Sequence, residues 1–561
     1  MVCRAVLLAL LALALAAPLA RAADPIMPLS EVRSGMACTG LSVIRGTDIT
    51  SFDVEVLDVI ADDAVGPRIL VRVSGPAVDL TGVGPGFSGS PILCGGRNAG
   101  AISEAVGDYG NKVVLATPIE SILSARPAPL PAGARRAPRL LRSARSLAGA
   151  LTVSGLSTGT RRLLARAARR AGRTVLAAPP GPVGGYPPQE LLPGAAVAAA
   201  LSTGDVALGA VGTVAYRDGD QVYAFGHSLD GLGRRSLFLQ DAYVFGVIGN
   251  PIGVPDLGAI TYKLTSSGGH ELGSVTNDTF SAIYGRTGAD PPSIPLTVAA
   301  RERGGESVSL SSRVADERAL GLGVDLSFVA PLAASTAVDR LLDAFEPVTL
   351  KVCTRIRVRQ RSAPLGFCNP YFDIFDALSD IADATSLVES FDLAPLDIRG
   401  ARVSIAAERG VVDDVIVGAR AKRRVRAGQR LRVRVALRRR GGRARSVTVR
   451  VPIPRDVQPG EHVLVIEGNG FASEEDELII EFIGELARGA RAAAGQPAPA
   501  HGAQAEPRTV RQLARQIAAL RQRPGITARL RGREPRLVLG SDEIRFDGRA
   551  KLRLRVVKAS R

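Results

Sequence analysis

The stretch Gly86-Phe87-Ser88-Gly89-Ser90-Pro91 decides how the N-terminal part of this sequence is interpreted. A serine that attacks a carbonyl group needs a tight turn on which backbone N–H groups converge on the developing negative charge. Glycine permits such a turn because it has no Cβ, and glycines stand two positions before Ser88 and directly after it. We therefore expect Ser88 to be a nucleophile, with the amides of Gly86 and Ser88 as its oxyanion hole. A plain Gly/Ser/Pro hairpin is the alternative interpretation of these six residues alone.

The segments on both sides of this stretch favour short β-strands. Between residues 25 and 125, apolar and polar residues alternate in short runs that Gly, Pro and Asp interrupt. This pattern is typical of strands and turns rather than of helices. The same alternation resumes near residue 195 and continues to about residue 350. We therefore expect two β-rich halves, of which the first carries Ser88.

A serine nucleophile needs a base, and the chain has only four histidines. His501 lies in an Ala/Gln/Pro-rich linker, His462 lies on an expected strand, and His270 follows a glycine-rich loop. His227 ends a strand that runs into a turn, where an imidazole can project into a cleft as a general base. We expect His227 to be that base, and a structural role is the alternative for a single histidine at a strand end.

Several motifs together resemble the SpoIVB-type (stage IV sporulation protein B) serine peptidase family, which is trypsin-like. They are Gly35-Met36, Phe52–Leu57, Ile69–Arg72, Gly86–Pro91, Pro193–Val197, Gly212–Val214 and Ala224–His227. The resemblance covers roughly residues 27 to 300. It implies a chymotrypsin-like double β-barrel that hydrolyses peptide bonds, sometimes its own, with Ser88 as nucleophile and His227 as base. In the founding member the His motif precedes the Ser motif, so the order is permuted here, and Phe87 replaces the usual Met.

The third member of a catalytic triad is less well defined by the sequence. Asp278 lies at a family-like turn and is our candidate for orienting His227. The alternatives are Asp241 or Asp79 as the carboxylate, and a Ser–Lys dyad that uses Lys112 or Lys263.

Gly155-Leu156-Ser157-Thr158-Gly159 matches the Gly-x-Ser-x-Gly elbow of α/β-hydrolases. The flanking chain lacks alternating strands and helices, so we predict a turn and a helix cap at this position. The sequence has no phosphate-binding loop, dinucleotide fingerprint or cluster of metal ligands. We therefore expect neither a cofactor nor a metal ion.

The N-terminus and the cysteines indicate an exported protein. Arg4 is followed by an apolar run and by Ala20-Arg21-Ala22, a pattern typical of a cleaved secretory signal peptide, with a retained anchor as the alternative. Four cysteines remain beyond it, and an even number in an oxidising compartment predicts two disulfides. Cys353 and Cys368 enclose a short loop of 14 residues. We expect these two to pair, and Cys38 to pair with Cys94.

The formal charge of +17 comes mostly from arginine. Proteins that bind nucleic acids usually combine such charge with aromatic residues for stacking, but this chain has no Trp and only 4% aromatic residues. We expect no nucleic-acid partner. The arginine-rich tracts are interpreted as solvated faces, with peripheral contact to an anionic envelope surface as an alternative.

The sequence divides into eight segments, and the predicted fold class is mainly β. They are a signal peptide (1–22), a Ser-bearing β-barrel half (23–125), a basic Ala/Arg/Pro-rich spacer with one helix (126–190), a His-bearing β-barrel half (191–350), a Cys loop and helical connector (351–395), an immunoglobulin-like β-sandwich (396–485), a flexible linker (486–508), and a helix with a β-hairpin (509–561). We expect an exported serine endopeptidase that cleaves a protein substrate or itself. The alternative is an inactive peptidase-like surface scaffold or adhesion protein.

Overall fold

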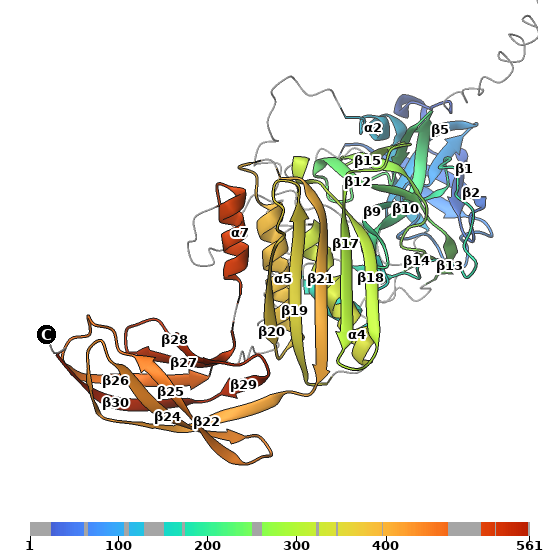
Figure 1. The fold of residues 1–561 in the computed structure, drawn as a ribbon. Coiled ribbons are helices and arrows are strands. Elements are labelled where there is room, and N and C mark those ends of the chain that lie inside the picture. The colour runs from blue at the N-terminus through green and yellow to red at the C-terminus, as the bar shows by residue number, and fades with distance from the viewer. Residues whose placement is uncertain are drawn as a thin grey trace, which may run out of the picture.

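The computed structural model describes most of the chain and shows a mainly β protein. The described residues are 24–60, 66–105, 112–127, 151–170, 174–249, 261–320, 322, 325–343, 346–394, 396–468, 507–521 and 523–558. The expected signal peptide lies outside them, as does most of the expected flexible linker. Figure 1 shows an elongated molecule, with barrels at one end, a sheet flanked by helices in the middle, and a smaller β-unit at the other end. Among the described residues, no helix has the length and apolar character needed to cross a bilayer.

The first barrel contains Ser88, and its strands close in the order β1-β2-β3-β6-β5-β4. The strands are β1 (Ala37–Val43), β2 (Ile49–Ile60), β3 (Arg68–Ser74), β4 (Pro91–Cys94), β5 (Arg97–Ala105) and β6 (Val113–Pro118), followed by helix α2 (Ile119–Leu123). On β2, Phe52, Val54 and Val56 are buried while the residues between them are exposed. This alternation is the signal that allowed these strands to be predicted.

A second six-stranded barrel follows in the chain and contains His227. Its strands are β9 (Ala196–Gly204), β10 (Ala207–Asp218), β11 (Gln221–Ala224), β12 (Gly233–Asp241), β15 (Glu271–Asp278) and β16 (Ile283–Thr287). They pair in the ring β9-β12-β15-β16-β11-β10, which closes because β10 also pairs with β9. A separate hairpin of β13 (Val244–Ile248) and β14 (Tyr262–Thr265) reaches the first barrel through the Gly46–Val244 bridge. Two barrels therefore occur in the expected chain order.

The second barrel's sheet continues beyond β9 into five further strands, which the sequence interpretation did not group together. They run in the order β18 (Ser307–Ala315), β17 (Ser293–Glu302), β21 (Ile398–Arg409), β19 (Val348–Val358) and β20 (Leu365–Tyr371). Helices α4 (Asp325–Leu342) and α5 (Ile374–Glu389) share one hydrophobic core with this part of the sheet. The segment around β21 was expected to open the sandwich, but it inserts between β17 and β19 instead. Local alternation predicts a strand but does not say which sheet it joins.

Part of the expected spacer forms a strand–helix–strand unit at the edge of the same sheet. Strand β7 (Leu151–Ser154) pairs with β10 and, in parallel, with β8 (Val175–Ala177), and helix α3 (Thr158–Arg170) connects them. The hydroxyl of Ser157 accepts the Thr160 amide at 3.0 Å and also contacts Asp339. Ser157 is thus the cap of α3, as the sequence predicted, and not a nucleophile elbow.

Two sheets share one core at the C-terminal end of the molecule. One sheet has the order β25 (Ala444–Pro452), β24 (Arg430–Arg439), β22 (Val412–Ala421) and β29 (Ile544–Asp547), and the other has the order β23 (Arg424–Arg426), β30 (Arg549–Val557), β26 (Gly460–Gly468), β27 (Gly525–Leu530) and β28 (Arg536–Gly540). The expected terminal hairpin is wrong, because β29 and β30 lie in different sheets. Helix α7 (Val510–Ala519), which the sequence analysis grouped with that hairpin, packs against α5 and β20.

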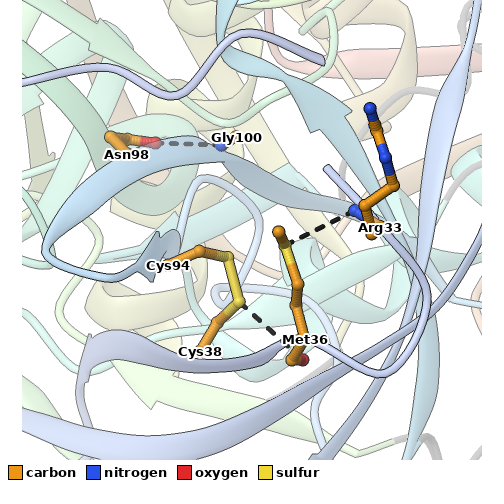
Figure 2. The surroundings of a disulfide bond; sticks show 6 residues. All are labelled: Arg33, Met36, Cys38, Cys94, Asn98 and Gly100. Carbon is orange, nitrogen blue, oxygen red and sulfur yellow. Dashed lines mark hydrogen bonds between the residues drawn. A yellow bond between two sulfur atoms is a disulfide. The ribbon is translucent and has the colours of Figure 1, made fainter. Parts of the chain in front are cut away.

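Both predicted disulfides are present. Cys38–Cys94 joins the neighbouring strands β1 and β4 inside the first barrel (Figure 2), and Cys353–Cys368 joins the opposed strands β19 and β20. Both cysteines of the first pair are buried, and the Cys38 Sγ lies 4.0 Å from the Met36 carbonyl oxygen. Each bridge therefore fixes a strand pair within one sheet.

Removing the two disulfides should destabilise the protein unequally. Cys38 and Cys94 are 56 positions apart in the sequence, and Cys353 and Cys368 are 15 positions apart. In the chain-entropy account, we expect losses of about 4 kcal/mol for Cys38→Ala/Cys94→Ala and about 3 kcal/mol for Cys353→Ala/Cys368→Ala. Chemical denaturation followed by circular dichroism measures both losses, and a larger loss for the second pair would contradict this prediction.

Candidate active site

Ser88 lies on the loop that leads into β4, and its side chain is partly exposed. Gly86 and Gly89 on either side have φ values of +97° and +96°, in the region that only glycine adopts without strain. Phe87 between them is fully buried in the core of the first barrel. The buried Phe87 anchors the loop, and the two glycines turn it so that Ser88 faces outward.

Two backbone amides beside Ser88 have no hydrogen-bond acceptor among the residues that the structure describes. The Pro85 carbonyl accepts the Lys263 amide at 2.9 Å, and the Phe87 carbonyl accepts the Ser90 amide at 2.8 Å. In a trans peptide the C=O and N–H groups point in opposite directions, so these bonds turn the amides of Gly86 and Ser88 the other way. Within the described chain, neither of these two amides donates to a protein acceptor. The oxyanion hole expected from the sequence would need both of these donors unoccupied.

Ser88 and His227 line one cavity of about 260 Å³ between the two barrels. Residues from both barrels, from β14 and from β8 form its walls. No hydrogen bond joins Ser88 Oγ to His227 among the described residues. Such bonds are often long without substrate and shorten only in the complex, so a Ser–His pair does not require this bond in the free protein.

His227 follows a strained turn at the end of β11. Phe225 and Gly226 have φ values of +70° and +68°, and a bulky residue in this region costs on the order of 1 kcal/mol or more. Two hydrogen bonds hold the turn, the first within the second barrel and the second to the first barrel. The Phe225 amide donates to the Thr213 carbonyl at 3.2 Å, and the Gly226 carbonyl accepts the Thr117 hydroxyl at 2.7 Å. The strain is therefore maintained where His227 meets the first barrel.

The contacts of His227 leave one ring nitrogen available as a base. Nδ1 lies 2.7 Å from the Ser228 carbonyl oxygen, which can only accept a hydrogen bond. In the neutral ring Nδ1 therefore carries the proton, and Nε2 is the basic atom. Burial lowers the pKa of His227, although the Ser228 carbonyl opposes this shift. The ring is consequently neutral near pH 7 and able to accept a proton.

Asp278 does not take the position expected of it. Its carboxylate accepts the backbone amides of Leu229, Asp230 and Gly231, each at 2.8 Å, and so holds the turn that follows His227. Burial, and then the neighbouring Asp230 carboxylate, raise the pKa of Asp278. The bond to His227 Nδ1 that a triad carboxylate would make is made by the Ser228 carbonyl instead.

The two competing aspartates also lie elsewhere. The Asp241 carboxylate accepts hydrogen bonds from His270, Tyr186 and Gln189, and Asp79 forms an exposed ion pair with Lys112. Because Lys112 is paired with Asp79 and does not line the cavity with Ser88, it is not a candidate base for Ser88. The carboxylate that lines the cavity with Ser88 and His227 is Glu104 of β5.

Sequence reasoning missed Glu104. It forms a 3.4 Å ion pair with the buried Arg68, and its charge raises the pKa of His227 while that of Arg68 lowers it. The one signal available was its place on the strand that follows the Ser88 motif. An acidic residue on a half-exposed strand is too common for that signal to be distinctive.

Lys263 of β14 places a buried amine beside the Ser88 loop. Its Nζ donates to Ser42 Oγ at 2.7 Å and to Thr213 Oγ1 at 3.1 Å, and it lies 4.5 Å from the centre of the Phe87 ring. Thr213 Oγ1 in turn donates to the Gly86 carbonyl at 2.8 Å. Burial lowers the pKa of Lys263 to about 7, and none of the hydrogen-bond partners described for Nζ is a carboxylate. The structure therefore brings one of the two candidate lysines into the cavity.

The two barrels touch through backbone at this point. A Cβ on Gly89 would lie 1.9 Å from the Thr213 carbonyl oxygen and 2.6 Å from the Phe225 nitrogen. A Cβ on Gly212 would lie 2.9 Å from the Ser88 carbonyl oxygen. Both positions exclude any side chain, so the Ser88 loop and the His227 turn are held at fixed separation.

The chain matches no protein-family model, and it has no match among curated proteins or among solved structures. The resemblance to the SpoIVB-type peptidases therefore rests on the motifs of the sequence.

Gly89→Ala should disrupt the contact between the barrels. Its Cβ would meet backbone atoms that cannot move aside, whereas Gly95, also at positive φ, has open space at its Cβ position. We expect Gly95→Ala to cost about 1 kcal/mol, from backbone strain alone. Gly89→Ala should cost at least about 3 kcal/mol more, in the range of severe overpacking. Denaturant unfolding measures both, and equal losses would refute the tight contact.

Proposed function

We propose that this protein is a serine endopeptidase that hydrolyses peptide bonds through an acyl-enzyme. The observation that supports this most strongly is the pair of free amides of Gly86 and Ser88, in the same cavity as a neutral histidine. A loop with only a structural role has no need to leave two amides free beside a partly exposed serine. The family resemblance points to the same chemistry.

In the proposed reaction, Ser88 Oγ attacks the scissile carbonyl carbon while His227 Nε2 takes the hydroxyl proton. The carbonyl oxygen becomes negative and receives hydrogen bonds from the amides of Gly86 and Ser88. His227 then gives its proton to the leaving amine, which departs as the C–N bond breaks. Water attacks the resulting ester, again losing a proton to His227, and Ser88 is regenerated.

When His227 takes the proton it becomes a positively charged imidazolium, which must be held in place and stabilised by nearby groups. The Ser228 carbonyl fixes the ring orientation through Nδ1, as the aspartate does in a triad. Glu104 supplies a negative charge in the same cavity, reduced by its pairing with Arg68. We therefore assign His227 the role of base, the Ser228 carbonyl that of orienter, and Glu104 that of electrostatic support.

The cavity walls indicate which substrate would fit. Ile102, Val114, Val211 and Phe225 make much of the wall apolar. We propose that a small apolar side chain of a polypeptide occupies it, because apolar walls stabilise such a group by removing it from water.

The remaining interpretations from the sequence belong to the same proposal. They are a chymotrypsin-like relation of the two barrels, an immunoglobulin-like C-terminal sandwich, export by a cleaved signal peptide, and cleavage of an envelope protein or of the enzyme itself. The alternative is an inactive surface or adhesion scaffold with the same barrels.

A fluorophosphonate probe tests the proposal, because it reacts covalently with activated serines. We expect labelling of the wild-type protein, none of Ser88→Ala, and a rate at least about 100-fold lower for His227→Ala, since the base is lost. Ser157→Ala is the matched control and should label normally. Labelling that persists in Ser88→Ala would refute the assignment, and a folded wild-type protein that does not react would support the scaffold alternative.

The pH dependence of labelling distinguishes the two candidate bases. Burial holds the pKa of His227 below its usual value of 6.5, so the rate should stay constant from pH 8 to 7 and fall only as His227 is protonated in more acidic solution. If Lys263 were the base, the rate would already halve near pH 7, because its pKa lies at about 7. Lys263→Met should therefore leave the shape of the profile unchanged. A profile that loses its acidic limb in this variant would assign the role to Lys263.

A further inference from the structure

The C-terminal sheet β25-β24-β22 presents one strongly basic face. Its outward side chains include five exposed arginines, which we call the arginine face: Arg420, Arg430, Arg432, Arg434 and Arg450. They alternate with the buried Leu431, Val433 and Val435 of β24, which point into the sandwich core. The five guanidinium groups thus project from the same side of the sheet.

Like charges lie directly opposite each other on this face. Arg432 pairs in register with Arg450 of β25, and Arg434 pairs with Arg420 of β22. Cβ atoms of such pairs are about 5 Å apart, and successive outward residues of a strand are about 7 Å apart. Directly opposed like charges destabilise a sheet. An anion that bridges them would remove this repulsion.

The face lacks the carboxylates that balance arginines elsewhere in the sandwich. Within the described residues, none of the five arginines forms an ion pair. At the other end of the same sheet, Arg439 and Arg445 share the buried Asp414. Pairing with a carboxylate is therefore available to this sheet, and the arginine face does not use it.

The opposite sheet provides a contrast. On β30 the outward residues Lys551, Arg553 and Arg555 are equally exposed. There, however, Arg555 lies opposite Glu461 and Arg549 lies opposite Glu467. Two basic residues of β30 thus lie opposite a carboxylate of β26, as on an ordinary solvated face, although Arg555 also lies beside Arg424 of β23. On the arginine face, by contrast, the strand registers of the described residues place no carboxylate opposite any of the five arginines.

We propose that the arginine face docks the protein onto an anionic lipid surface. Arginine recognises phosphate groups by two parallel hydrogen bonds, and a face spread over three strands matches a flat array of headgroups better than a single polymer chain. The outward residues between the arginines, Gly418, Ala436, Ser446 and Thr448, are small and offer no aromatic ring on which a base could stack. The sandwich lies at the end of the molecule opposite the barrels (Figure 1), so the cavity stays accessible after docking. This inference does not depend on the proposed peptidase activity.

Sedimentation with vesicles tests this proposal. The full chain should bind vesicles of equal parts phosphatidylglycerol and phosphatidylcholine, should not bind pure phosphatidylcholine, and should dissociate as salt is raised. Arg432→Gln/Arg434→Gln/Arg450→Gln should weaken binding on the order of 100-fold. The matched control Lys551→Gln/Arg553→Gln/Arg555→Gln removes the same charge from the opposite sheet and should weaken it less than about 5-fold.

Three outcomes would overturn the proposal. They are no binding to the anionic vesicles, equal losses of vesicle binding in the two triple variants, or tighter binding of a single-stranded DNA oligonucleotide than of vesicles at the same ionic strength.

Thermal unfolding at low salt provides the control for folding. The triple variant of the arginine face should melt at the same temperature as the wild-type protein or at a higher one, because the substitutions remove charges that repel one another. If the triple variant melts at a lower temperature, vesicle binding is compared between the single variants Arg434→Gln and Arg553→Gln instead. We expect Arg434→Gln to weaken binding about 5-fold more than Arg553→Gln does.

Discussion

The rest of the site depends on two hydrogen bonds from Thr213 to the Ser88 loop. The Thr213 amide donates to the Ser88 carbonyl and its hydroxyl donates to the Gly86 carbonyl, both at 2.8 Å. Thr213 belongs to β10 of the second barrel, whereas the loop belongs to the first. One residue thus fixes the serine loop against the strand that neighbours the His227 turn. Because glycines occupy the points of closest approach, the contact is made between backbones, which hold a geometry better than side chains do.

This contact also determines the electrostatics of the cavity. Lys263 of β14 donates to Thr213 through its side chain and to the Pro85 carbonyl through its backbone amide. Lys263 therefore both orients the Gly86 amide and places a buried amine at the cavity. Burial disfavours the charged forms of both Lys263 and His227. A cavity that favours neutral bases suits proton transfer near pH 7, and amide donors act more strongly there than in water.

Much of the fold could be predicted from the sequence, since the deciding signals are local. Alternating residues define the strands of the first barrel, and the even number of cysteines predicts both bridges. The sheet to which β21 belongs could not be predicted, because pairing between distant strands leaves no local pattern. The same holds for the terminal strands β29 and β30, which have the alternation of a hairpin but join different sheets.

The candidate site could be predicted in part. The Ser88 motif, with the amides expected to form its oxyanion hole, has a local glycine signal, and His227 emerged because the chain has few histidines. The structure brings Ser88 and His227 to one cavity. Asp278 was the candidate triad carboxylate because it lies at a family-like turn. In the structure it stabilises the turn that follows His227 instead. Glu104 could not be singled out, and Lys263 could be named only beside Lys112 as a candidate lysine, because the place of both residues at the cavity comes from burial in an interface between barrels. Charged residues on strands are usually exposed, so nothing in the sequence marks Glu104 or distinguishes Lys263 from Lys112.

The most direct test of the central claim is a crystal structure of the protein after reaction with diisopropyl fluorophosphate. The account predicts a phosphorus–oxygen bond to Ser88, with the phosphoryl oxygen about 2.7 to 3.1 Å from the amide nitrogens of Gly86 and Ser88. His227 Nε2 should lie within hydrogen-bond reach of an adduct oxygen. An adduct on a different residue, or a phosphoryl oxygen directed away from both amides, would contradict the account.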